Sequence, residues 1–296
     1  MRVTQSMLNS QLLRNLNNNL GRLNVLQDQL ATGRKINKPS DDPVGISYSL
    51  RYRSELNAND QYQRNNSSVT SWLEAYDKSI SEVNSVLQRA RELAVQGANS
   101  TNPDQAMQAI AQEVDELYEH LVQVGNSKFN GKYIFNGQKT DIEPYASGTA
   151  ETTSTDSGLI KLEVSTGVTL QVNVTGTELF GAGSDPTNAF QVLSNLKTAL
   201  NANDHSAVSS MLGQIDQRMD NILVKWAEVG ARANRIELIT NRLLDESINV
   251  QSLLSRTEDA DVAELMVNLK TQENVYQASL STGAQIIRPS LVDFMR

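Results

Sequence analysis

The sequence predicts a mainly α-helical protein: a long helical-bundle and coiled-coil rod formed by the N- and C-terminal halves, with a small inserted β domain. Apolar residues recur at alternating steps of three and four over long stretches of both halves, which is the spacing of a helical seam. Aromatic residues make up only 5% of the chain, so the core must consist mainly of aliphatic side chains. Between the halves the pattern changes to strict alternation, which indicates β-strands.

The first predicted helix covers residues 5–31 and carries a leucine seam that polar Gln27 interrupts. Asn15 and Asn17–Asn19 lower its intrinsic helix propensity, so we expect this helix to depend on partners for its order. The seam residues are Leu13, Leu16, Leu20, Leu23 and Leu30.

A break follows at residues 30–45, LATGRKINKPSDDPVG. Gly33 can end the first helix by adopting a positive φ, and Pro39 cannot continue it. Ser40, Asp41 and Asp42 offer oxygens to the free N–H groups of a new helix, in which Pro43 fits the first position. The signals alone are those of an ordinary helix–loop–helix.

Two helices are predicted next, over residues 43–98 and from Asn102–Pro103 to about residue 124. The short turn between them implies an antiparallel hairpin. Their strict seams are Val69, Leu73, Tyr76, Ile80, Val83, Leu87, Ala90 and Ala94 in the first, and Met107, Ile110, Val114, Leu117, Leu121 and Val124 in the second.

The β insertion is predicted over residues 129–187. FNGKYIFNG at 129–137 places two Asn-Gly turns around a four-residue strand. Alternating apolar residues over 160–164 and 168–174 flank Ser165–Gly167 and predict a β-hairpin. We expect residues 176–188 to form a loop back to helix.

The C-terminal half is predicted to resume as helix near residue 188 and, after a polar break at 201–205, to continue as one long helix to about residue 253. A terminal helix is expected over 257–288, before Pro289. Its stripe is Val262, Met266, Leu269, Tyr276, Leu280 and Ile287.

We therefore expect three domains: paired terminal helices (1–42 and 256–296), a helical bundle (43–128 and 188–255) and the β insertion (129–187). In the simplest nested arrangement the chain ends pair with each other and the β part lies at the far tip. Narrow seams and weak ends are typical of an assembly subunit, with the two terminal stripes as its assembly interface. The alternative is a self-contained bundle onto which the ends pack.

No constellation of residues predicts catalysis, and we expect neither a cofactor nor a metal. The chain has no cysteine and only two histidines, His120 and His205, neither of them in a metal-ligand spacing. The acidic residues Glu258, Asp259, Asp261 and Glu264 fit the first turns of a helix better than a cation site.

Neither nucleic acid nor a membrane is an expected partner. The formal net charge of −8 disfavours binding to a phosphate backbone. No apolar run approaches the roughly 18 residues of a membrane helix. The first residues, MRVTQSMLNSQLL, do not resemble a cleaved signal peptide, so we expect any export to use another route.

The break resembles the N-terminal segment of bacterial flagellins and their relatives, the hook-associated junction proteins. Further similar stretches are RELAVQ at 91–96 and FNGK at 129–132, and others follow residue 230. The matching residues of the break are Leu30, Gly33, Ile36, Asn37, Asp41, Asp42 and Gly45. From residue 230 onward the matching residues are Gly230, Ala231, Asn234, Arg235, Glu237, Ser255, Arg256, Asp259, Asp261 and Ala263.

Three stretches are more similar to the hook–filament junction proteins than to flagellins: MRVTQSM at the start, KYIFNGQKT at 132–140 and PSLVDFMR at the end. The resemblance implies an extracellular structural adaptor between hook and filament, exported without a cleaved signal. It implies self-association in a ring or tubular layer. Its other partners would be the first hook-associated junction protein, flagellin, and an export chaperone that binds the C-terminal segment. A short flagellin is the alternative.

Overall fold

The computed structural model describes residues 5–100, 102–146 and 148–286. The fold class is confirmed, since long helices dominate and the described strands form two small antiparallel pairs. The chain forms two compact units. The terminal unit contains residues up to Ala58 and from Glu246 onward, and the central unit is Asn59–Asp245. The three-domain division expected from the sequence remains a proposal.

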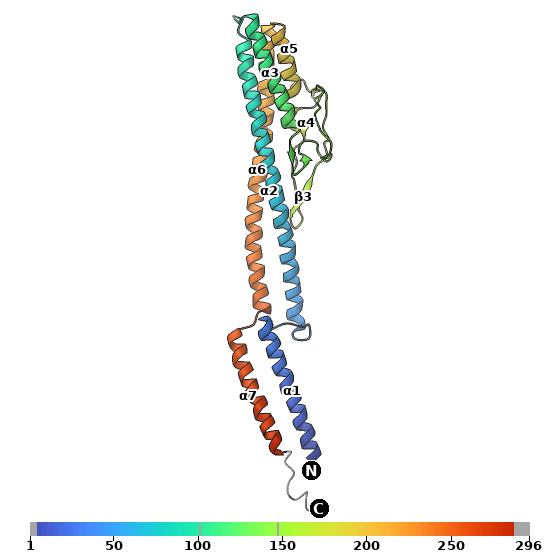
Figure 1. The fold of residues 1–296 in the computed structure, drawn as a ribbon, viewed down its shortest axis with the longest axis vertical. Coiled ribbons are helices and arrows are strands. Elements are labelled where there is room, and N and C mark those ends of the chain that lie inside the picture. The colour runs from blue at the N-terminus through green and yellow to red at the C-terminus, as the bar shows by residue number, and fades with distance from the viewer. Residues whose placement is uncertain (1–4, 101, 147, 287–296) are drawn as a thin grey trace, which may run out of the picture. The chain divides into compact units, whose positions relative to one another are not determined.

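In the terminal unit, helix α1 (Gln5–Thr32) lies beside α7 (Val262–Ile286) (Figure 1). The start of α2 (Pro43–Gly97) and the end of α6 (His205–Glu258) complete the unit. The pairing of the two chain ends is therefore as predicted.

The break between α1 and α2 forms for the expected reasons. Gly33 has φ +69° directly after α1. Asp42 accepts the N–H groups of Val44 and Gly45 through Oδ1, at 3.0 and 2.9 Å, and so caps the start of α2. Asp41 instead braces the loop, because its Oδ2 accepts the N–H groups of Asn37 and Lys38 at 3.0 and 2.8 Å. The hydrogen bonds from Lys38 and Asn37 lower the pKa of Asp41.

In the central unit, α3 (Asp104–Gly125), α5 (Ala189–Asn201) and the remaining parts of α2 and α6 share one apolar core. At one end of this unit the α2–α3 turn meets the α5–α6 turn, where His205 Nδ1 lies 2.9 Å from the carbonyl oxygen of Gly97. The predicted seams of α2 and α3 are buried, with Leu117 partly exposed. Strict 4,3 spacing therefore identified this core correctly.

The β region contains the hairpins β1–β2 (Lys128–Phe129 and Lys132–Tyr133) and β3–β4 (Lys161–Ser165 and Val168–Gln171). The predicted four-residue strand at 132–135 is wrong, because the strand ends at Tyr133, and beyond it, among the described residues, only the N–H of Ile134 still donates across, to the carbonyl oxygen of Ser127 at 3.3 Å. Phe135 is buried instead and packs edge-on against Tyr76 of α2 and against Phe180 of the short helix α4 (Gly176–Phe180). Burial of the aromatic ring replaces the second half of the strand.

The β region lies along the side of the central unit, so the expectation of a far tip is wrong. Asn65 of α2 donates to the carbonyl oxygen of Glu163 at 2.8 Å, and Arg242 of α6 donates to Ser165 Oγ at 2.8 Å. The rings of Tyr145 and Phe180 pack at a tilt against Phe190 of α5, so the region shares the core of the helices. A small β insertion gains more from this shared core than from standing alone.

Helix α4 (Gly176–Phe180) occupies part of the stretch predicted as loop. Thr175 and Glu178 form a capping box, in which each side chain bonds the other's backbone N–H. The T-x-x-E spacing was visible in the sequence and could have identified this helix start.

The terminal helix also begins later than predicted. α6 continues to Glu258, and α7 starts at Val262, where Asp261 Oδ1 accepts the N–H groups of Ala263 and Glu264. The predicted stripe residue Ile287, Pro289 and the segment PSLVDFMR lie outside the described residues.

Candidate assembly site

The paired helices α1 and α7 bury only a narrow stripe of each helix. On α7, Leu265 and Leu269 are 8% and 9% exposed. Gly283 allows a close approach, because a Cβ there would lie 2.8 Å from Cδ2 of Leu12 on α1. Leu12, Leu16, Leu23, Leu26 and Leu30 of α1 are half-buried.

Polar contacts cross the same stripe. Asn19 Nδ2 donates to Ser279 Oγ at 3.2 Å, and Gln272 Nε2 donates to Asn19 Oδ1 at 3.4 Å. Amide pairs of this kind select one register at some cost in stability. These contacts therefore set the register of α1 against α7 while adding little to the stability of the helix pair.

The structure divides the ten predicted interface residues into two groups. Half-buried or buried in the stripe are Leu16, Leu23, Leu30, Leu269 and Tyr276. Exposed are Leu13, Leu20, Val262, Met266 and Leu280. Only the second group is exposed on the paired helices, and the assembly role of all ten residues stays a prediction. The sequence prediction did not separate these two groups, because residue spacing alone cannot decide which of two adjacent leucines, such as Leu12 and Leu13, faces the partner helix.

Sequence analysis missed several residues of both groups. Leu12, Leu26 and Leu265 belong to the buried stripe, and the recurrence of apolar residues on a second, parallel series could have revealed them. The residues missed on the exposed surface are Met7, Leu8, Val25, Val267 and Val275.

A groove of about 750 Å³ lies between α1 and α7. Gly21, Arg22 and Val25 line it from α1, and Asn268 and Thr271 line it from α7. A Cβ at Gly21 would meet nothing within 4 Å. The groove offers space for a side chain from another helix.

A cluster around Glu258, which we call the clasp, joins the break to the end of α6. Glu258 Oε1 pairs with Arg34 Nε at 2.8 Å and with Arg53 Nη2, and Ser49 donates to Oε2 at 2.7 Å. The Glu258 side chain is 3% exposed. A buried carboxylate of this kind is stable only while its partners remain.

The backbone reinforces the clasp. The N–H of Lys35 donates to the carbonyl oxygen of Glu258 at 2.8 Å, and the N–H of Ala260 donates to that of Gly33 at 3.0 Å. The two crossings between helices, at 33–35 and 258–260, thus form one short antiparallel contact. The clasp therefore holds the segment after α1 and the segment before α7 next to each other within the terminal unit.

Glu258 therefore does not act as an N-terminal acid of the last helix, as its sequence position suggested. Glu264 does lie in that first turn, and Asp261 precedes α7 and caps it, whereas Asp259 accepts from Ser255 Oγ at 2.6 Å. Among the described residues no group of His, Asp and Glu side chains is placed to hold a metal ion. His120 Nε2 lies 3.0 Å from Glu82 Oε1. No described helix combines the length and apolar character that crossing a membrane requires.

Two family models match this chain. The model of the bacterial flagellin N-terminal helical region matches residues 3–140, and that of the C-terminal helical region matches residues 188–295. The chain belongs to the bacterial flagellin family. The family is a structural one of the bacterial flagellum, so the chain is a structural flagellar component, and the resemblance seen in the motifs is confirmed.

Relatives within the family carry two kinds of name. A flagellin from Halalkalibacterium halodurans is 28% identical over 275 residues, covering 92% of this chain and 90% of the relative. Flagellar hook-associated protein 3 of Salmonella typhimurium is 24% identical over 318 positions and covers 100% of both chains. The solved flagellar hook-associated protein 3 of Legionella pneumophila superposes with TM-score 0.61 at 17% identity, covering 70% of this chain and 99% of its own, and shares the fold.

Proposed function

We propose that this flagellin-family chain is an adaptor subunit of the hook–filament junction. The end-to-end match to hook-associated protein 3 of Salmonella typhimurium supports this role. The aromatic segment KYIFNGQKT supports it further, because this segment is more similar to the junction proteins than to flagellins. The adaptor would act outside the cell and would be exported without a cleaved signal peptide.

The observation that carries an assembly role is the exposed apolar surface of α1 and α7. Leu13, Val262 and Met266 are 59%, 52% and 51% exposed although they lie on regular, amphipathic helices. A layer of two helices buries one stripe per helix, so apolar residues outside that stripe require further helices. We infer that neighbouring subunits supply these helices.

The partners that we propose are those implied by the resemblance to the junction proteins. Copies of the chain would associate through α1 and α7 in a ring or tubular layer, with the first hook-associated junction protein on one side and flagellin on the other. Before assembly, an export chaperone would cover the exposed apolar residues of the C-terminal segment. Such covering would protect a surface that otherwise promotes aggregation.

The second candidate is a filament subunit. The flagellin of Halalkalibacterium halodurans is slightly more similar in identity than the hook-associated relative, which favours it. Both roles use the terminal surface, and only the ability to elongate a filament separates them.

Substitution of exposed terminal residues tests the assembly role. Leu13→Asp and Met266→Asp place a charge on the free surface and should abolish sedimentable assemblies, while circular dichroism of the dilute monomer stays unchanged. Ile142→Asp, at a loop residue that is 61% exposed, is the matched control and should assemble normally. Leu269→Asp is a poorer test, because Leu269 is buried in the pair itself. Normal assembly of both terminal variants would contradict the role.

A further inference from the structure

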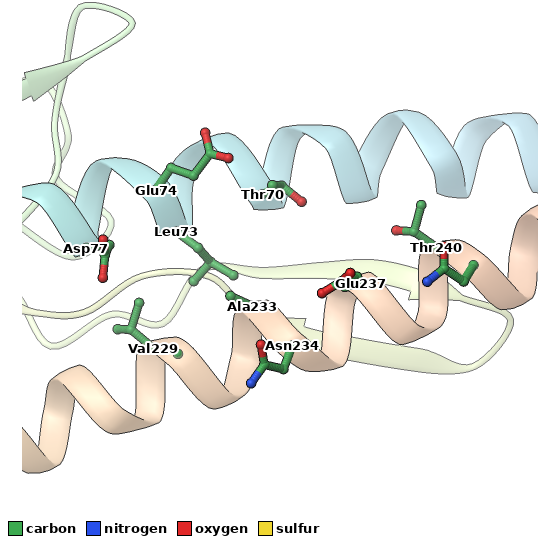
Figure 2. Close-up of a pocket in the computed structure, with 11 residues that line it drawn as sticks. Thr70, Leu73, Glu74, Asp77, Val229, Ala233, Asn234, Glu237 and Thr240 are labelled. Atoms are coloured by element: carbon green, nitrogen blue, oxygen red, sulfur yellow. The ribbon is translucent and has the colours of Figure 1, made fainter.

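A groove in the central unit lies between α2 and α6 and has a volume of about 490 Å³ (Figure 2). Leu73 of α2 and Val229 and Ala233 of α6 point toward one another and form its apolar floor. Thr70 and Thr240 add hydroxyl groups at one end of the groove. The groove therefore suits a segment with an apolar body and polar edges.

The charge of this groove has one sign. Glu74, Asp77 and Glu237 line it, and no lysine or arginine does. Asp77 accepts the indole N–H of Trp226 at 2.6 Å. Within the part of the chain that the structure describes, the side chains of Glu74 and Glu237 are exposed and make no hydrogen bond or ion pair. Two carboxylates are thus available to a cationic partner.

The face of α6 beside the groove is exposed and uncharged. Residues spaced by three and four on a helix share one face. Such a series contains Leu223, Ala227, Gly230, Ala231, Asn234 and Leu238, of which Leu223 and Leu238 are 46% and 71% exposed. Small residues between two leucines allow another backbone to approach closely.

The β1–β2 hairpin has the complementary character. Lys128 and Lys132 are exposed, and no acidic residue lies between Ser127 and Phe135. Asn130 and Gly131 form its tight turn with φ of 51° and 77°. Lys128 Nζ lies 4.4 Å from the ring centroid of Tyr133, and Lys132 forms no ion pair with an acidic residue among the described residues. The hairpin therefore presents two exposed cations, one of them beside an aromatic ring.

This hairpin cannot fill the groove of its own chain. Phe129 packs on Trp72 of α2 at 5.3 Å between ring centroids, and Trp72 does not line the groove. Successive residues of a helix point about 100° apart, so the hairpin and the groove lie on different faces of α2. Their complementarity can be satisfied only between two copies.

We propose that the α2–α6 groove receives the β1–β2 hairpin of a neighbouring copy, with Lys128 and Lys132 beside Glu74 and Glu237. Two different surfaces on one chain make a heterologous contact, which generates a ring or a helical array. This inference rests on the proposed self-association and adds a second contact to that made by α1 and α7. Exposed charge pairs act chiefly on specificity and on the rate of association.

Zero-length carbodiimide cross-linking tests the contact, since it joins a carboxylate to an amine only when the two touch. Full-length chain is assembled from an equal mixture of ¹⁴N- and ¹⁵N-labelled protein, cross-linked and digested. We expect mixed-isotope peptides that join Lys128 or Lys132 to Glu74 or Glu237. Assemblies that lack such peptides would overturn the contact and leave the terminal contact standing, whereas failure to assemble would contradict both proposals.

Charge reversal gives an independent measurement on the same protein. Glu237→Lys and Lys132→Glu should each raise the concentration needed for assembly roughly tenfold, as expected for like charges at a contact, and the double variant should restore it. Glu116→Lys on the exposed face of α3 is the matched control and should behave as the unsubstituted chain. Equal behaviour of Glu237→Lys and Glu116→Lys, or a double variant no better than either single one, would overturn the proposal.

Discussion

At the residue scale, Glu258 is the side chain whose role is least apparent from its position in the sequence. Its neighbours in the acidic run suggested a helix N-terminus, but it is buried and accepts from Arg34, Arg53 and Ser49. Those partners lie more than 200 positions away, as the separations of 209 for Ser49 and 205 for Arg53 show. Local patterns carry no information about such contacts, so sequence analysis could not predict the clasp.

Glu258→Gln tests the clasp. The amide keeps the shape and loses the charge-assisted bonds, so the contact should weaken by roughly 1–3 kcal/mol. Hydrogen exchange should accelerate at the N–H groups of Lys35 and Ala260, which donate across the clasp. Exchange at the α2 core residues Ile80 and Leu87 should not change.

Glu55→Gln is the matched control for Glu258→Gln. Glu55 lies on the same unit and pairs with Arg51 on an exposed helix face, where the loss of an ion pair has little effect. Equal exchange rates at Lys35 and Ala260 in both variants would show that the buried carboxylate does not hold the crossing together.

Asp185 gives the central unit a dependence on pH. Burial by itself would raise the pKa of Asp185, but the N–H and hydroxyl of Thr187 and the guanidinium of Arg218 together lower it below the ordinary value of 3.8. A carboxyl group whose pKa is lowered by folding stabilises the native state above its ordinary pKa, and this stabilisation is lost as pH falls through the lowered pKa.

Asp185→Asn should therefore reduce the melting temperature near pH 7 and converge with the unsubstituted chain as the pH falls below 3.8. Thermal unfolding from pH 7 to pH 2, with Asp220→Asn as the control for removing a carboxylate from the surface, measures the difference. A melting-temperature difference that is the same at every pH would contradict an ionic role for Asp185.

At the element scale, the sequence predicted the long helices well and the short elements poorly. Strict 4,3 seams extend over many turns in α2, α3 and α6, so one deviating residue does not change the result. Strand β2 and helix α4 contain two and five residues, and for these the packing of Phe135 and Phe180 decides the structure. The terminal seams lie between these cases, because the sequence identified the helices without distinguishing the buried leucines from the free ones.

The close approach of α1 and α7 at Gly283 can be tested with two glycines. Gly21→Ala should strengthen α1 by roughly 1 kcal/mol, because its Cβ meets nothing within 4 Å. Gly283→Ala should not stabilise its helix in the same way, because the added Cβ would lie 2.8 Å from Cδ2 of Leu12 and would displace that side chain. Hydrogen exchange of the two helices in the monomer should slow in Gly21→Ala only. Equal slowing in both variants would mean that the helices are not in close contact at Gly283.

At the scale of the whole molecule, the order of the elements was predictable and their packing was not. Both chain ends form helices that pair, as expected from the nested order of the elements. The place of the β region beside α2 and α6 depends on single contacts such as Asn65 with Glu163 and Arg242 with Ser165. The nested order of elements is compatible with a β region at the tip or along the side of the helices, and only the tertiary contacts distinguish these two positions.

The free surface of α1 and α7 is the feature that links the fold to its function. A self-contained bundle would bury Leu13 and Met266, which are exposed here. Under our proposal, both roles considered for this chain, junction adaptor and filament subunit, would use this surface. They differ in whether a subunit can add to copies of itself without limit.

Seeded polymerisation separates the two roles most directly. Concentrated full-length chain is mixed with short filament fragments and, separately, with hooks that carry the first hook-associated junction protein, and both mixtures are viewed by electron microscopy. An adaptor should leave the fragments unchanged in length and add a single short layer to the hooks. Long filaments growing from the fragments would contradict the junction role and identify a filament subunit.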